Sequence, residues 1–122
     1  MDAGANTNCK PLNLLQFAQM ANIYLKRIHN IEKPKIGLLN IGTEETKGNE
    51  LVRESYQLLK EKSEELDINF VGNVEGRDAF SGKIDAVITD GFTGNVFLKT
   101  VEGLGKFVKR SLTENLKRNI IN

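Results

Sequence analysis

The stretch Lys83–Val96, KIDAVITDGFTGNV, decides the fold because it joins a strand pattern to a helix pattern through a turn rich in glycine. Its residues before Asp90 are mostly apolar, as expected for a strand that is buried on both faces. Gly91 and Gly94 allow a tight turn, and a segment with helical periodicity follows. A strand that leads directly into a helix predicts an α/β protein.

The rest of the chain repeats this alternation of helices and strands. We expect helices over 13–28, 50–66 and 95–118, and strands over 35–42, 68–74 and 83–91. Asn49 is the expected N-cap of the second helix, and the segment 75–82 is expected to be a loop. This order predicts a single α/β domain over residues 1–122, with three layers around a mostly parallel sheet.

Composition narrows the possible functions. The 17 Lys and Arg residues nearly balance the 16 Asp and Glu residues, so nucleic-acid binding is not favoured. One Cys excludes an internal disulfide framework and a clustered zinc site. The beginning, MDAGAN, resembles the exit of a strand whose body is missing, and the end, LKRNIIN, leaves the last helix without a cap. We therefore expect a middle portion of a longer enzyme.

Three polar loops follow the predicted strands, over 40–49, 72–78 and 90–95. Ligands of open α/β sheets bind at the carboxyl ends of the strands, so these loops are expected at one edge. Lys47 and Arg77 lie in two of them, and Lys99 lies one turn into the helix after the third. Free N–H groups at that helix start also attract anions. The pattern predicts an anion site, with phosphate as the commonest anion.

Simpler interpretations of these residues remain open. The loop GTEETKGN lacks the Walker A spacing, and DGFTGN has only a G-x-x-G spacing, which does not identify a nucleotide site. Gly91 and Gly94 are also typical of a tight turn, and Asp90 of a helix cap. Glu44 and Glu45 also fit solvated loop charges.

Two other reactive residues carry little signal. His29 follows the first helix without a nucleophile pattern nearby, so we do not expect it to act as a base. Cys9 has no accompanying His motif, which is more typical of an inert thiol.

Five segments together resemble the PlsX family, the bacterial phosphate:acyl-[acyl carrier protein] acyltransferases of phospholipid synthesis. They are DAGAN, LLQFAQMANIY, KIGLLNIGTEETKGNEL, NFVGNVEGRD and DAVITDGFTGNVFLKTVEG, and the likeness extends to about Gly105. The resemblance implies a partial fold similar to that of phosphotransacetylases and the isocitrate/isopropylmalate dehydrogenases. It also implies transfer of a fatty acyl group from acyl carrier protein to inorganic phosphate, giving acyl-phosphate, and we expect neither cofactor nor metal.

The resemblance implies partners and a location as well. It implies a homodimer in the cytoplasm that associates peripherally with the inner face of the membrane and supplies a glycerol-3-phosphate acyltransferase. The family's chain is longer on both sides, and its DAMGGD-like N-terminal motif is not found here. This chain is therefore expected to hold one wall of a cleft shared between domains.

The residues suggest a mechanism for this reaction. Our hypothesis is that Lys47 and the N–H groups of DGFTGN hold phosphate, while Asn73 and Asn95 donate to the tetrahedral oxyanion. Asp90 and Glu45 would orient these groups. Besides Lys47, the residues predicted to bind phosphate or substrate are Gly42, Glu45, Gly48, Arg77, Gly91, Thr93, Gly94 and Lys99.

Two other functions stay open. The chain could be a catalytically incomplete module that dimerises or binds acyl carrier protein, and exposure of Val101, Leu104, Val108 and Leu112 would favour this. It could also be a relative of the short-chain phosphotransacetylases that uses acyl-CoA, because no docking patch for acyl carrier protein is recognisable.

Overall fold

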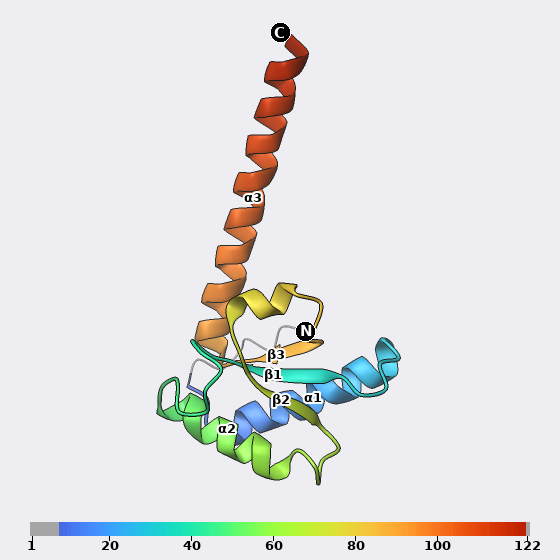
Figure 1. Cartoon of the computed structure of the whole chain (residues 1–122), viewed down its shortest axis with the longest axis vertical. Helices are drawn as coiled ribbons and strands as arrows, with labels where there is room; N and C mark the ends of the chain where they lie inside the picture. Colours follow the sequence, from blue (N-terminus) through green and yellow to red (C-terminus); the bar gives the residue numbers. More distant parts are fainter. Residues whose placement is uncertain (1–7, 122) are drawn as a thin grey trace.

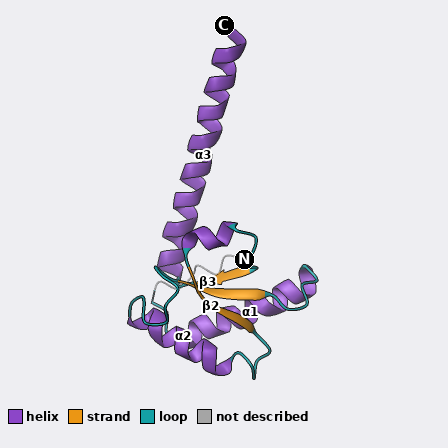
Figure 2. Ribbon diagram, in the orientation of Figure 1, coloured by secondary structure: helices purple, strands orange, loops and turns teal. Residues whose placement is uncertain are grey.

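A computed structural model describes residues 8–121 of the chain, with the side chain of Ile121 excepted, and contains three strands, three α-helices and one 3-10 helix (Figure 2). The elements are α1 (Pro11–Ile28), β1 (Lys35–Leu39), α2 (Glu50–Lys62), β2 (Asn69–Val74), the 3-10 helix η1 (Gly76–Phe80), β3 (Ala86–Ile88) and α3 (Gly91–Ile121). The predicted order of helices and strands is confirmed, and η1 replaces most of the loop predicted over 75–82. The strand exit predicted at the start of the sequence lies outside the described residues.

The sheet is open and parallel, with the order β2-β1-β3. Leu38 in β1 is the pairing partner of Asn73 in β2 and of Ile88 in β3. β1 and β2 approach closely beside Gly37, where an added β-carbon would lie 2.6 Å from the side chain of Val74. The predicted α/β class with a parallel sheet is confirmed.

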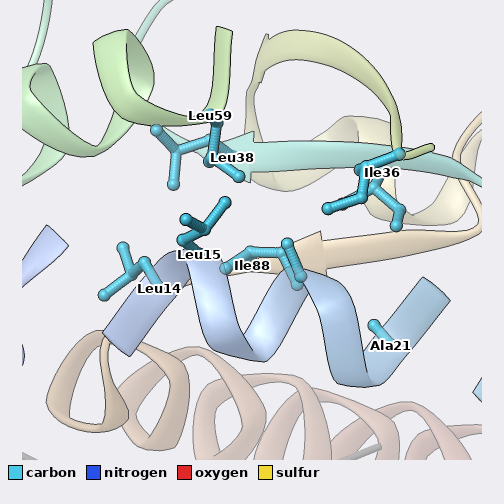
Figure 3. Packing of buried hydrophobic residues seen from close by; sticks show 9 residues of the cluster. Leu14, Leu15, Ala21, Ile36, Leu38, Leu59 and Ile88 are labelled. Carbon is cyan, nitrogen blue, oxygen red and sulfur yellow. The ribbon is translucent and has the colours of Figure 1, made fainter. Parts of the chain in front are cut away.

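The helices cover the two faces of the sheet unequally. Helices α1 and α2 pack against each other on one face, and η1 lies on the opposite side (Figure 1). Apolar side chains from α1, α2 and the sheet pack together between the two helices and the sheet (Figure 3). This core consists of Leu14, Leu15, Ala18, Ala21, Ile36, Leu38, Leu59, Ile68 and Ile88.

Several predicted boundaries were wrong. Helix α1 begins at Pro11 rather than at residue 13, because proline suits the first turn of a helix. Ile28, the last residue of this helix, is 61% exposed. Strand β3 has only three residues, of which Ala86 and Val87 are half-buried, so the predicted long buried strand is wrong.

Helix α3 is longer than predicted at both ends and projects away from the sheet (Figure 1). It begins at Gly91 instead of residue 95, and it continues through the two isoleucines that were expected to lie beyond it. Leu104 and Leu112 are 61% and 58% exposed. The described helices include none that is long and apolar enough to cross a membrane.

Candidate anion site at the strand ends

Three buried polar side chains mark the carboxyl ends of the three strands. Asn40 follows β1, Asn73 lies near the end of β2, and Asp90 follows β3, and each is at most 9% exposed. Because all strand pairs are parallel, these ends lie at one edge of the sheet. The structure thus brings the three predicted loops to the same edge.

The loop between β1 and α2 is tied down by side chains from two strand ends. The Asn40 side-chain amide donates to the main-chain carbonyl of Lys47 at 3.0 Å, and its oxygen accepts the N–H of Ile41 at 2.7 Å. The Asn73 side-chain amide donates to the carbonyl of Glu44 at 3.0 Å. These bonds fix the loop at three points, which are Ile41, Glu44 and Lys47.

Lys47 combines a fixed main chain with an accessible side chain. Its N–H donates to the Glu44 carbonyl at 3.1 Å, while its own carbonyl accepts from Asn40. Its stem passes over Gly42, where an added β-carbon would lie 3.2 Å from Lys47 Cγ. Within residues 8–121, the Lys47 ammonium makes no ion pair and no hydrogen bond. The exposed ammonium therefore remains available to an anion.

Gly48 closes this loop in a conformation that favours glycine. Its φ is +94°, and an added β-carbon would lie 2.8 Å from Asn40 Oδ1 and 3.0 Å from Val52. The guanidinium of Arg53 in α2 donates to the Gly48 carbonyl. Asn49 then caps α2 by accepting the N–H of Val52 at 2.9 Å, as predicted.

Asp90 uses both carboxylate oxygens at the start of α3. Oδ1 accepts the N–H of Thr93 at 2.9 Å, and Oδ2 accepts the Thr93 hydroxyl at 2.7 Å. The Asp90 carbonyl accepts the N–H of Gly94 at 2.9 Å. Asp90 is therefore a helix cap, and the amides of Thr93 and Gly94 are used within the turn rather than free for phosphate.

The remaining predicted residues are spread around this edge. Arg77 lies on η1, and its guanidinium is 3.6 Å from the carboxylate of Glu75. Glu45 lies 3.6 Å from the ammonium of Lys60 in α2. Asn95 and Lys99 are exposed on the first turns of α3. No hydrogen bond or ion pair joins Glu45, Arg77, Asn95 or Lys99 to Lys47 in the part of the chain that the structure describes.

A cleft of about 310 Å³ runs along β3 and reaches the start of α3. Asp90, Gly91 and Gly94 line one end, and apolar side chains such as Phe17 and Phe97 line much of the rest. None of Lys47, Arg77 and Lys99 lines it. The cleft therefore reaches this edge beside Asp90, but it does not include the loop that carries Lys47.

Sequence reasoning missed Asn40. Its role depends on a bond to a carbonyl seven residues later, which no periodicity reveals. The available signal was an asparagine placed directly after an apolar strand and before a glycine-containing loop. Asn side chains in such places often bond to nearby main-chain groups.

The sequence of this chain is similar to those of known proteins. The family described as "Fatty acid synthesis protein" matches residues 1–122. A phosphate acyltransferase of Thermoanaerobacterium thermosaccharolyticum is 50% identical over 99% of this chain and 35% of its own length. One from Elusimicrobium minutum is 54% identical over 99% of this chain and 34% of its own length.

This chain spans about a third of the length of the curated relatives it matches. The relatives bear the activity name that the PlsX resemblance implied, so that resemblance is confirmed. Since the family matches the whole sequence and these relatives are about half identical across nearly all of it, the chain belongs to the fatty acid synthesis protein family.

Proposed function

We propose that this chain forms the phosphate-binding wall of a phosphate acyltransferase, which transfers a fatty acyl group from acyl-[acyl carrier protein] to inorganic phosphate. The observation that carries the proposal is Lys47, whose main chain is held on both sides while its ammonium is unpaired among the described residues. A fixed cation at the carboxyl ends of parallel strands suits an incoming phosphate. The names of the relatives support the same reaction.

The chemistry requires positioning more than a reactive side chain. A phosphate oxygen attacks the thioester carbonyl, the new C–O bond forms, and the C–S bond breaks to release the thiol of the carrier. Holding phosphate beside the thioester makes this attack a local event. Asn95 is exposed on α3 and remains the proposed donor to the oxyanion. The amide of Asn73 is engaged with Glu44, so we assign Asn73 to holding the loop.

The test is acyl-phosphate formation from palmitoyl-acyl carrier protein and phosphate. This chain and the full-length Thermoanaerobacterium relative are assayed side by side, with palmitoyl-CoA as a second donor. Activity in both proteins would support a complete site at this edge, and activity in the relative alone would support a single wall. A relative that is inactive with the carrier substrate but active with CoA would contradict the proposed donor.

A second proposal is that the chain forms a homodimer through α3. Leu104, Val108 and Leu112 are each at least 45% exposed and recur at helical spacing. Such a continuous apolar stripe is typical of a helix that packs against a partner. Peripheral membrane association and delivery of acyl-phosphate to a glycerol-3-phosphate acyltransferase belong to the same proposal, on the strength of the family resemblance.

Light scattering coupled to size exclusion tests the dimer. The Leu104→Gln/Leu112→Gln variant should elute as a monomer at concentrations where the wild type is dimeric. Lys106→Gln/Lys117→Gln, on the opposite side of the same helix, is the matched control and should stay dimeric. A wild-type chain that is monomeric at all concentrations would contradict the proposal.

A further inference from the structure

We propose that Asn40 is a positioning residue for phosphate binding, acting through Lys47. The inference rests on the proposed function, because it concerns the same cation. Asn40 lies directly after β1, the middle strand of the sheet, and its N–H donates to the carbonyl of Val74 at 2.8 Å. With the main chain of Asn40 anchored in this way and its side chain buried, its amide is a fixed point on the sheet.

The two polar atoms of this amide hold the two ends of one loop. Oδ1 accepts from Ile41, the first loop residue, and Nδ2 donates to the carbonyl of Lys47, seven residues after Asn40. An amide can accept and donate at once, whereas a carboxylate of the same shape can only accept. The bond to Lys47 therefore requires the amide nitrogen.

A second amide reinforces the loop from the neighbouring strand. Asn73 donates to the Glu44 carbonyl, which also accepts the N–H of Lys47. Both main-chain polar groups of Lys47 are thus fixed, one by Asn40 and the other through Glu44. The Lys47 ammonium projects from this fixed base, which reduces the conformational freedom it would lose on binding an anion.

The crowding beside Gly48 shows that this arrangement leaves little room to shift. A β-carbon there would lie 2.8 Å from Asn40 Oδ1, so the loop closes directly against the amide. Asn40→Asp keeps the shape and the bond to Ile41 but places a negative oxygen against the Lys47 carbonyl. This variant removes the hydrogen bond from the side chain of residue 40 to the Lys47 carbonyl with little change in side-chain volume.

The experiment compares Asn40→Asp with Asn22→Asp in the 122-residue chain. Asn22 is a matched control because it is 5% exposed and its amide donates to the Asp67 carbonyl at 3.0 Å, before the amino end of β2. Inorganic phosphate is the probe, with its Kd measured by calorimetry and the loop followed by amide hydrogen exchange. Asn40→Asp should weaken phosphate binding about tenfold and speed exchange at Lys47, whereas Asn22→Asp should change neither. Asn73→Asp, which removes the bond to Glu44, is a second variant with the same expected direction.

A double-mutant cycle separates positioning from general damage. In a Lys47→Ala background, Asn40→Asp should have little further effect on the phosphate Kd, because Asn40 acts through Lys47. Full additivity, or an unchanged Kd in both Asn40→Asp and Asn73→Asp, would overturn the positioning role and leave the proposed function standing. A wild-type chain that binds no phosphate would overturn the phosphate site itself and the positioning role with it.

Discussion

Asn73 holds Glu44 across 29 positions of the chain, through a 3.0 Å bond from its side-chain amide to the Glu44 carbonyl. This bond ties the loop after β1 to the neighbouring strand β2. The loop would otherwise depend on contacts within itself, and exposed loops are commonly mobile. The place of the Lys47 main chain is therefore set by bonds from the sheet.

Replacing Lys47 should remove much of the phosphate affinity. We expect Lys47→Ala to raise the phosphate Kd by about tenfold or more, because a charge-assisted contact to the anion is lost. Lys60→Ala is the control, since Lys60 lies in an exposed pair with Glu45 and such pairs contribute little. Calorimetric titration with phosphate measures both. Equal affinities in wild type and Lys47→Ala would rule out Lys47 as the phosphate cation.

Replacing Gly48 should destabilise the fold more than replacing another glycine with positive φ. Gly48→Ala combines backbone strain with a clash against Asn40 and Val52, so we expect a loss of about 2 to 3 kcal/mol. Gly82 has a φ of +78° but no atom within 4 Å of its added β-carbon, so Gly82→Ala should cost about 1 kcal/mol. Urea unfolding of the two variants gives the comparison. A larger loss for Gly82→Ala would contradict the crowding described at Gly48.

Removing the hydroxyl of Ser55 should be harmless. Ser55 is fully buried in α2, and its Oγ has no hydrogen-bond partner among the described residues. Ser55→Ala removes an unsatisfied polar atom, so the free energy of unfolding should stay within about 0.5 kcal/mol or rise. Leu59→Ala, one turn later in the same helix and also buried, should cost about 2 to 5 kcal/mol because it leaves a cavity. A costly Ser55→Ala would mean that this hydroxyl has a bonding partner.

The pH dependence of stability should carry a contribution from Asp67. A hydrogen bond from Lys26, at 2.8 Å, and the charge of Lys26 hold the pKa of Asp67 below its ordinary value of 3.8. Because the folded pKa is lowered, this contribution is present above the ordinary value and is lost as the pH falls through the folded pKa. In Lys26→Gln the pKa of Asp67 should rise toward 3.8, which an NMR titration of its carboxyl carbon measures. Lys33→Gln should raise it less, because the charge of Lys33 is a smaller cause.

The sequence predicted the elements of the fold better than their burial. Helical periodicity and apolar runs located each α-helix and strand of the described residues, and Asn49 was correctly predicted as a cap. The strand around Val87 was predicted to be long and buried because its residues are mostly apolar, yet β3 is a short edge strand. Asp85, expected inside that strand, instead accepts the N–H of Lys35 at 2.7 Å before β3 begins. Burial depends on which strands become neighbours, and a local pattern does not contain that information.

The candidate site also contains features that the sequence predicted and features that it did not. Lys47 was selected for its residue type and its place after a strand, and both are visible in the sequence. Its carbonyl accepts a bond from Asn40, and its N–H donates to the Glu44 carbonyl, which Asn73 holds from 26 positions beyond Lys47 in the chain. The turn after Asp90 was ambiguous because the same residues suit a cap and an anion site, and the capping bonds are now explicit. Residue type and position selected Lys47 as the proposed phosphate ligand, whereas the bonds made by Asn40, Asn73 and Asp90 required coordinates.

The strand order also bears on how the chain is made. Of the three described strands, β1 comes first in the sequence, yet it occupies the middle of the sheet. Its pairing with β2 and the packing of α1 on α2 involve only residues up to Val74, so this half can assemble while the remainder is still on the ribosome. β3 then adds to the free edge of β1, so among the described strands the one that completes the sheet emerges after the other two have paired.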